Sequence, residues 1–179
     1  MLNKSTESST NTFTTKSGFT IVELLIVIVV IGILAAITIV AFNGVQQKAR
    51  NTQVISGVNA YYKAFKQYQT LEGDFPTNIG CLGKGYPGDQ CWIGDSGVRV
   101  VSVPLDNELS PIIGGNKPTL ATSRFPIGIA NNMRAGAVYF TTPFPRIVYY
   151  LQGTNQSCSV AGASGVNEGG VVTQCQINL

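Results

Sequence analysis

The sequence predicts an α+β protein in which one long N-terminal α-helix packs on a small antiparallel β-sheet. Three observations predict this class. A nearly uncharged apolar run extends from Phe19 to Phe42, and an amphipathic pattern continues it to Leu71. Beyond that point, short runs of β-branched and aromatic residues alternate with Gly- and Pro-rich turns. We therefore expect the helix to precede a separate globular, β-rich domain over residues 72–179.

The first 18 residues form a segment of different composition. They are rich in Ser, Thr and Asn, and their charged residues are Lys4, Glu7 and Lys16. They show no periodic apolar face on which a helix or strand could pack. The sequence therefore predicts a disordered leader over residues 1–18.

The apolar run that follows is long enough to cross a membrane. Its 24 residues from Phe19 to Phe42 are almost all Ile, Val, Leu or Ala, and as a helix they span roughly 36 Å. The apolar core of a cleaved secretory signal would end after roughly 7 to 15 residues. We therefore expect residues 19–44 to form the membrane-spanning half of a longer helix.

Glu23 is the single charged residue between Lys16 and Lys48. A carboxylate at a bilayer centre costs roughly 2.5 to 3.5 kcal/mol, and less near an end, so some interaction must offset this cost. Two explanations are open. Thr20 and Glu23 have the spacing of a capping box, in which each side chain bonds the backbone amide of the other. Alternatively, Glu23 faces a cation of a neighbouring molecule, and the pair fixes the register between the two molecules.

The junction before the apolar run carries a family resemblance. Lys16-Ser17-Gly18 is followed by Phe19-Thr20-Ile21-Val22-Glu23, which places a basic residue and a Gly before Phe, and Glu at the fifth position of the helix. This segment resembles the class III signal peptide of type IV pilins (prepilins) and of type II secretion pseudopilins. The resemblance implies that a prepilin peptidase/methyltransferase cleaves between Gly18 and Phe19 on the cytoplasmic side and N-methylates Phe19. The mature chain would then have 161 residues.

The same resemblance implies the partners of the mature chain. It predicts a lipid bilayer before assembly, an inner-membrane assembly platform, and then other copies of the chain with minor pilins in a homopolymeric filament. Subunits of this family stack through their N-terminal helices, and the counterpart of Glu23 faces the N-terminal amine of a neighbour. With the Gly18–Phe19 junction beside it, this role of Glu23 is favoured over the capping box.

The second half of the helix, residues 45–71, is amphipathic. Its apolar residues recur with spacings of four, three, four and three, which places them on one helix face. We expect this stripe to form the core with the globular domain. Gly73 and Pro76 follow as signals for the end of the helix. The stripe consists of Val54, Val58, Tyr61, Phe65 and Tyr68.

The globular domain contains several short runs that predict strands. Closely spaced turn residues between them favour an antiparallel meander, and a domain of this size with few long apolar runs has a modest core. Together with the long helix, the resemblance implies a single sheet packed on one helix, the pilin fold. The predicted strands are Val98–Val103, Ala137–Thr141, Arg146–Leu151 and Val171–Ile177.

All four cysteines lie beyond the apolar run, and none is in a Cys-x-x-Cys spacing. An even number in this position indicates two disulfide bonds and a location outside the cytoplasm. The sequence permits three pairings. We expect Cys81–Cys91 and Cys158–Cys175, because short sequential loops are the easiest to close in a meander. Four reduced thiols are the alternative, and a zinc site is disfavoured because the chain has no His.

Composition argues against an enzyme and against a cofactor. Without any His, Ser-His-Asp and Cys-His catalysis are excluded, and no Gly-x-Ser-x-Gly or phosphate-binding loop is present. Asp89 and Asp95 are better explained as turn residues than as calcium ligands, so no metal site is expected. Trp92, Tyr149 and Tyr150 are interpreted as packing residues. The mature chain has ten Lys or Arg against eight Asp or Glu and no basic run, so no direct nucleic-acid site is expected.

The predicted function is structural. We expect a type IV pilus subunit that polymerises into a surface filament (fimbrium) for cell adhesion, twitching motility or DNA uptake. The alternatives are a pseudopilin of a type II secretion system and a signal-anchored exported binding domain. Basic residues flank the apolar run equally, so the leader and the cysteines decide its orientation. The chain is expected to span the cytoplasmic membrane once, with its N-terminus in and C-terminus out, and then to enter an extracellular pilus.

Overall fold

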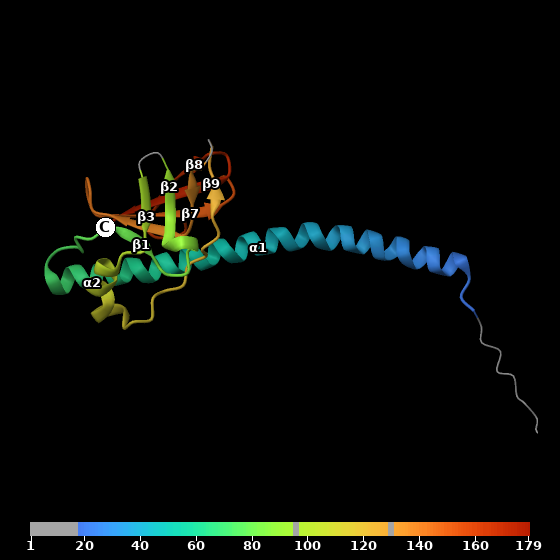
Figure 1. Ribbon diagram of the computed structural model, residues 1–179, viewed down its shortest axis with the longest axis horizontal. Coiled ribbons are helices and arrows are strands. Elements are labelled where there is room, and N and C mark those ends of the chain that lie inside the picture. Colours follow the sequence, from blue (N-terminus) through green and yellow to red (C-terminus); the bar gives the residue numbers. More distant parts are fainter. Residues whose placement is uncertain (1–17, 95–96, 129–130) are drawn as a thin grey trace, which may run out of the picture. The chain divides into compact units, whose positions relative to one another are not determined.

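The computed structural model describes residues 18–94, 97–128 and 131–179, with the backbone alone at Val40 and Ala41. The chain divides into two units, Met1–Phe42 and Asn43–Leu179. The described part contains a long N-terminal helix followed by antiparallel sheets, as Figure 1 shows. The predicted α+β class is therefore confirmed.

Helix α1 covers Ile21–Glu72, 52 residues, close to the predicted span of Phe19 to Leu71. The absence of Pro from its sequence permits this length, since Pro is by far the least favourable residue in a helix interior. Gly73 ends the helix in a left-handed conformation with φ +83°, and its N–H donates to the carbonyl of Gln69 at 3.0 Å. This is the C-terminal signal that the sequence indicated.

The described part of the globular unit forms two antiparallel sheets, whereas a single sheet was expected (Figure 1). The larger sheet has the strand order β1-β6-β7-β9-β8 and the smaller one β3-β2-β5-β4. The strands of the larger sheet are β1 Gly80–Leu82, β6 Ala137–Phe140, β7 Arg146–Gln152, β9 Val172–Asn178 and β8 Ser164–Glu168. Those of the smaller sheet are β3 Gly97–Val100, β2 Gln90–Gly94, β5 Met133–Arg134 and β4 Phe125–Pro126, and a 3-10 turn, Pro87–Asp89, precedes β2.

Three of the four predicted strands are confirmed as β6, β7 and β9. The prediction was wrong at the end of Val98–Val103, because helix α2, Val103–Ile113, begins there. The Ser102 hydroxyl accepts a hydrogen bond from the N–H of Leu105 at 3.4 Å, which caps the helix, and Pro104 in the first turn needs no N–H partner. Gly114, in the left-handed conformation, ends α2.

The larger sheet lies between α1 and the smaller sheet. On one face, the predicted α1 stripe is buried except for Tyr68, which is partly buried, and Phe65 stacks on Tyr139 with ring centroids 4.4 Å apart. The alternating residues Val138, Val148 and Tyr150 face the other way, into a second core with residues of the smaller sheet. The globular unit therefore has three layers, and its strands β6 and β7 contribute to both cores.

Two disulfide bonds are present, with the pairing expected from the sequence. Cys81 of β1 bonds Cys91 of β2, with Cα atoms 5.8 Å apart, and so links the two sheets. Cys158 bonds Cys175 of β9, with Cα atoms 5.7 Å apart, and holds the segment before β8 against the larger sheet. Both distances lie in the ordinary range for disulfides.

Candidate functional site

The junction between Gly18 and Phe19 lies just outside the helix. Both residues have no regular secondary structure, and Phe19 is 86% exposed. A peptide bond must be extended and accessible to enter a peptidase site, and this one is not held in the hydrogen-bonded ladder of α1. Lys4 and Lys16, which the sequence analysis placed in the leader, lie outside the described residues.

Glu23 forms the capping box at the start of α1. The N–H of Thr20 donates to Glu23 Oε2 at 2.8 Å, and the N–H of Glu23 donates to the Thr20 hydroxyl at 3.2 Å. The Thr20 hydroxyl also donates to Oε2, at 2.8 Å. Within the described residues, Oε1 of Glu23 accepts no hydrogen bond and the side chain is exposed. The cap therefore uses one carboxylate oxygen and leaves the other available.

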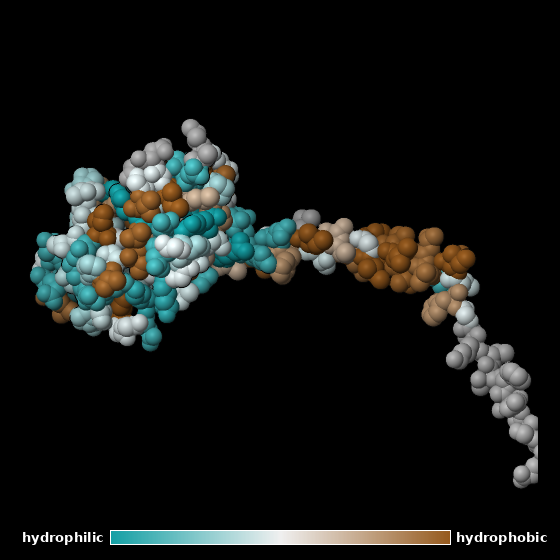
Figure 2. Space-filling view, in the orientation of Figure 1, coloured by the Kyte–Doolittle hydropathy of each residue, from teal (hydrophilic) through white to brown (hydrophobic). Residues whose placement is uncertain are grey.

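The first half of α1 carries apolar side chains on every side. Figure 2 shows this stretch as an almost unbroken hydrophobic surface. Within the described part of the chain, α1 is the one helix that is long and apolar enough to cross a membrane. The large apolar side chains described between Ile21 and Phe42 are about half exposed or more, so no other described part of the chain covers them. A surface of this kind requires lipid or other protein around it.

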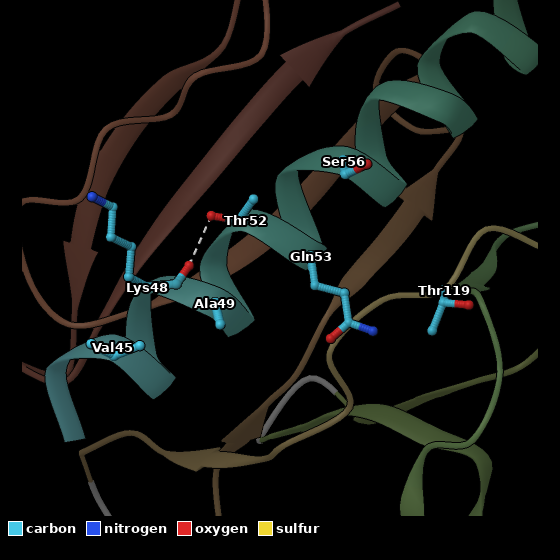
Figure 3. Close-up of a pocket in the computed structure, with 7 residues that line it drawn as sticks. All are labelled: Val45, Lys48, Ala49, Thr52, Gln53, Ser56 and Thr119. Atoms are coloured by element: carbon cyan, nitrogen blue, oxygen red, sulfur yellow. Dashed lines mark hydrogen bonds between the residues drawn. The ribbon is translucent and has the colours of Figure 1, made fainter. Parts of the chain in front are cut away.

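A shallow groove of about 600 Å³ runs along α1 in the globular unit (Figure 3). Lys48 is its single ionisable group, and the Thr52 hydroxyl in it donates to the carbonyl of Lys48 within the helix at 2.9 Å. This lining offers no acid–base pair and no nucleophile with a base. The groove is lined by Val45, Lys48, Ala49, Thr52, Gln53, Ser56 and Thr119.

The aromatic residues singled out in the sequence are largely packing residues. Tyr149 is buried against the α1 side of the larger sheet and Tyr150 against the other side. Burial raises the pKa of Tyr149 to about 12 and raises that of Tyr150 strongly. Trp92 is partly buried, with its ring centroid 5.9 Å from that of Tyr150.

The candidate calcium ligands are not brought together in the described structure. Asp89 is exposed in the turn before β2, and Asp95 lies outside the described residues. Among the residues that are described, no group of three or more His, Cys, Asp or Glu side chains could hold a metal ion.

Two polar networks were not foreseen. Asn51, which is buried, donates to the carbonyl of Gln152 at 3.0 Å and accepts from its N–H at 2.8 Å, and Gln47 donates to the same carbonyl at 2.7 Å. Asn51 lies three residues before Val54 and seven before Val58, so the helical spacing places it on the apolar stripe. A polar residue on that stripe could have indicated a buried side chain with hydrogen-bond partners in the globular unit.

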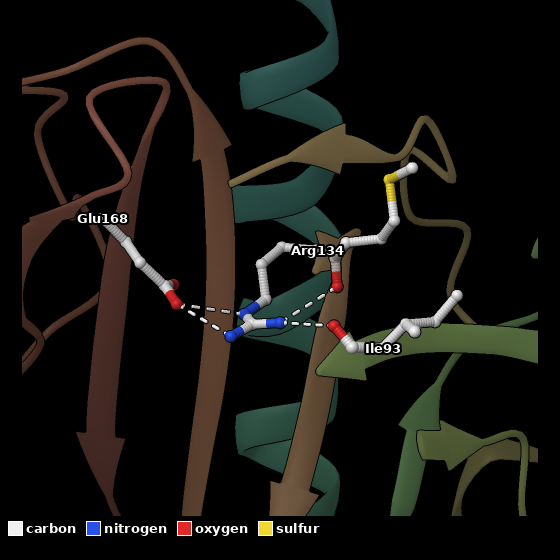
Figure 4. A network of polar contacts seen from close by, with 4 residues as sticks. Ile93, Arg134 and Glu168 are labelled. Carbon is white, nitrogen blue, oxygen red and sulfur yellow. Dashed lines mark hydrogen bonds and ion pairs between the residues drawn. The ribbon is translucent and has the colours of Figure 1, made fainter. Parts of the chain in front are cut away.

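The second network lies between the sheets, around Arg134 (Figure 4). Its Nε and Nη2 donate to Oε1 of Glu168 at 3.2 and 2.9 Å, and its Nη1 donates to the carbonyl of Ile93 at 2.8 Å. The guanidinium also lies 3.7 Å over the ring of Trp92. Because Arg134 belongs to β5 and Glu168 to β8, this ion pair joins the smaller sheet to the edge of the larger one.

Comparison with known proteins identifies the N-terminal segment. A family model described as the prokaryotic N-terminal methylation motif matches residues 14–39, which include Gly18, Phe19 and Glu23. Residues of this chain are 34% identical over 65 positions to a fimbrial protein of Neisseria meningitidis serogroup A. They are also 34% identical over 62 positions to type II secretion system core protein G of Aeromonas hydrophila. The N-terminal part of the chain is thus similar to that of type IV pilins and of a type II secretion core protein.

The likeness of this chain to these relatives is partial. The two matches cover 36% and 35% of this chain, and 38% and 43% of the respective relatives. A third relative, the type IV major pilin protein PilE1 of Neisseria gonorrhoeae, is 32% identical over 74 residues, 41% of this chain and 45% of that protein. The chain thus spans less than half the length of each of these relatives. No solved structure matches it with significance.

Proposed function

We propose that the chain is a prepilin that is cleaved between Gly18 and Phe19, N-methylated at Phe19 and polymerised into a type IV pilus. One observation carries the proposal: the methylation motif leads into an apolar half-helix that the described residues leave uncovered, with Glu23 near its start. Residues 1–18 are then the leader, 19–44 the membrane and filament-core half of the helix, 45–71 its amphipathic half, and 72–179 the exported domain.

The physical sequence of events follows from the surface of α1. In the membrane, lipid covers the apolar half-helix, and in the filament the same half-helices of neighbouring copies replace the lipid. Leaving the membrane moves Glu23 among apolar side chains, where a carboxylate is costly unless a cation faces it. The N-terminal amine created by cleavage supplies that cation, and the free Oε1 of Glu23 supports this pairing alongside the capping box.

The partners follow from this route. A prepilin peptidase/methyltransferase acts at the Gly18–Phe19 junction, an inner-membrane platform extracts the subunit, and other copies and minor pilins complete the filament. The amino end stays on the cytoplasmic side of the membrane, while the domain with both disulfides lies outside. The use of such a filament in adhesion, motility or DNA uptake depends on the surface of this domain.

The charge pair is tested with Glu23→Gln. Gln still suits the third position of the helix and keeps much of the cap, but it has no charge to offer an amine. We expect the variant to enter the membrane and to be cleaved, with incorporation into sheared filaments reduced at least tenfold, as removal of a buried charge partner implies. Immunoblots of membrane and filament fractions measure both quantities.

A matched control for this variant is Glu72→Gln, which removes the exposed carboxylate at the other end of α1. This control should assemble normally. Normal filament yield from Glu23→Gln contradicts the charge pair. Mass spectrometry of the mature protein tests processing separately: a methylated Phe19 at the N-terminus is expected, and retention of residues 1–18 contradicts the proposed cleavage.

A second candidate is a pseudopilin, favoured by the match to type II secretion system core protein G. The two functions differ in the polymer formed. A pilus subunit should be the main component of long filaments sheared from the cell surface, and its deletion should leave protein export intact. Loss of export together with absence of sheared filaments would assign the chain to a secretion system instead.

A further inference from the structure

Arginine side chains and aromatic rings form a continuous series across the two sheets. Trp92 of β2 and Phe140 of β6 meet edge to face, with centroids 5.8 Å apart. The guanidinium of Arg146 lies 4.9 Å from the ring of Phe140 and 5.6 Å from that of Phe144, and the guanidinium of Arg99 lies 5.6 Å from Phe140. We call these five residues the arginine–aromatic surface.

Two of its cations have no carboxylate partner within the described residues. Arg99 donates to the carbonyl of Val98 at 3.3 Å, and Arg146 donates to the carbonyls of Thr142 and Phe144. The Nε of Arg99 is buried and has no hydrogen-bond partner in the described structure. Both guanidinium groups lie near the ring of Phe140, and neither has a carboxylate to balance its charge in the described structure, so each can bind an anion.

The same surface leaves flat apolar groups in contact with solvent. Phe144 is 44% exposed, and Trp92 and Phe140 are partly exposed. Figure 2 shows apolar areas separated by hydrophilic ones on the visible face of the globular unit. A ligand that fits must therefore offer both negative charge and flat apolar faces.

Buried Arg134 packs against Trp92 and holds this ring of the arginine–aromatic surface in place. It is 6% exposed, it stacks on Trp92 from below the surface, and Glu168 neutralises its charge. Trp92 is therefore held in one orientation by a neutral support, so its ring and that of Phe140 are preorganised. A rigid aromatic group loses little conformational freedom when a ligand binds.

We infer that the arginine–aromatic surface binds single-stranded nucleic acid. Guanidinium groups recognise phosphate bidentately, which suits Arg99 and Arg146 to the backbone of the strand. Exposed rings such as Phe144 stack on bases, and this stacking tolerates any base sequence. A duplex hides the base faces, and an acidic polysaccharide has no aromatic faces to stack. The inference goes beyond filament assembly and does not depend on it.

This surface was not predictable from the sequence because its cations are far apart in the chain. Arg99 and Arg146 are separated by 47 positions, and no basic run surrounds either of them. The pairing of β6 with β7 places Phe140 opposite Arg146, and the packing of the smaller sheet brings Arg99 to the same ring. The expectation of no nucleic-acid site was based on the absence of a basic run. The fold brings arginines from distant positions together, so a basic run is not needed for such a site.

The test measures binding of the full-length protein in detergent to a fluorescein-labelled oligothymidine by anisotropy, over a range of salt concentrations. The double variant Arg99→Gln/Arg146→Gln should bind at least tenfold more weakly. The plot of log K against log salt concentration has a negative slope, and the magnitude of this slope should decrease by about 1.4 in the double variant. This is the value for two lost phosphate contacts on a single strand. A double variant that binds like the wild type overturns the inference.

The matched control is Lys48→Gln/Lys63→Gln, which removes the same charge from exposed positions of α1 and should change affinity little. If this control weakens binding equally, the attraction is a property of net charge and the inference fails. Equal near-ultraviolet circular dichroism of all variants establishes that the fold is kept.

Phe144→Ala separates stacking from charge. It keeps every cation, so the salt slope should stay constant while affinity for oligothymidine falls about fivefold, as loss of one stacked base implies. Affinity for heparin, a polyanion without bases, should not change. If Phe144→Ala leaves oligothymidine binding intact, or if heparin binds as tightly as oligothymidine to the wild type, the surface is not a nucleic-acid site.

Discussion

At the scale of single residues, Asn51 is the polar side chain that joins α1 to the end of β7. Its amide donates to the carbonyl of Gln152 and accepts from the N–H of the same residue, as a neighbouring strand would. A further bond, at 3.2 Å, reaches Oε1 of Gln156. Because Asn51 is buried, removing it leaves backbone groups without partners and without water.

We therefore expect Asn51→Ala to lower the free energy of unfolding by about 1 to 3 kcal/mol, because the backbone groups of Gln152 lose their partner. Asn59→Ala is the matched control on the same helix, since the Asn59 side chain donates only to the carbonyl of Ile55 in its own helix. It should cost less than about 0.5 kcal/mol. Denaturant unfolding of the full chain in detergent, followed by circular dichroism, compares the two, and equal losses would contradict the role of Asn51.

At the scale of elements, the connection between β5 and β6 is fixed by Tyr86. The Tyr86 hydroxyl donates to the carbonyl of Leu82 at 2.7 Å and accepts from the N–H of Ala137 at 3.4 Å. Gly136 lies between the two strands at φ +52°, and a Cβ atom there would stand 2.1 Å from the Tyr86 hydroxyl oxygen. The buried, bonded ring has no room to move away.

Gly136→Ala should therefore destabilise the globular unit by about 3 kcal/mol or more, since backbone strain and a steric clash act together. Gly162→Ala isolates the strain, because Gly162 also has a positive φ, +78°, but nothing lies within 4 Å of its Cβ position. This control should cost about 1 kcal/mol. Thermal unfolding of both variants gives the comparison, and similar melting temperatures would show that the Tyr86 contact is unimportant.

The elements also show what a sequence can reveal. The α1 stripe and strands β6, β7 and β9 were predictable because each repeats its apolar pattern over enough residues. Strands β4 and β5 have two residues each, too few for any alternation, and β8 contains one β-branched residue, Val166. These strands form through tertiary contacts, so the smaller sheet was missed. Helix α2 had local signals, Ser102 before Pro104 and Gly114 after the end, but the preceding valines favoured a strand.

The processing junction with Glu23 and the arginine–aromatic surface also differ in how far the sequence predicts them. Gly18, Phe19 and Glu23 lie within six consecutive positions, so their pattern is readable without the fold. The arginine–aromatic surface and the Arg134–Glu168 pair draw on residues from both sheets, which only tertiary packing brings together.

At the scale of the whole globular unit, buried tyrosines link stability to pH. Burial raises the pKa of Tyr61 and Tyr149 to about 12, and it raises the pKa values of Tyr86, Tyr139 and Tyr150 as well. In the unfolded chain these phenols ionise near pH 10. Their contribution is therefore fully present below about pH 10 and is lost as pH rises toward the folded pKa values, because only the unfolded chain releases protons in that window.

We expect the free energy of unfolding to be nearly constant up to about pH 9 and to fall steeply above about pH 10. Tyr149→Phe removes one buried phenol and should make this fall shallower, by up to about 1.4 kcal/mol for each pKa unit between the two states. Denaturant titrations at a series of pH values measure the slope, and tyrosinate absorbance should rise together with unfolding. Ionisation of all tyrosines near pH 10 in the folded protein would contradict this.

The way α1 is held in the globular unit determines how the unit resists mechanical force. Val54, Val58, Tyr61 and Phe65 all lie against the larger sheet along one helix face. A pull directed along the helix axis therefore shears these contacts simultaneously, instead of peeling them apart one after another. Many weak contacts loaded together yield at a much higher tension than the same contacts loaded singly. The side-chain hydrogen bonds from Gln47 and Asn51 to the carbonyl of Gln152 lie at the N-terminal end of this contact face, so they carry part of the same load.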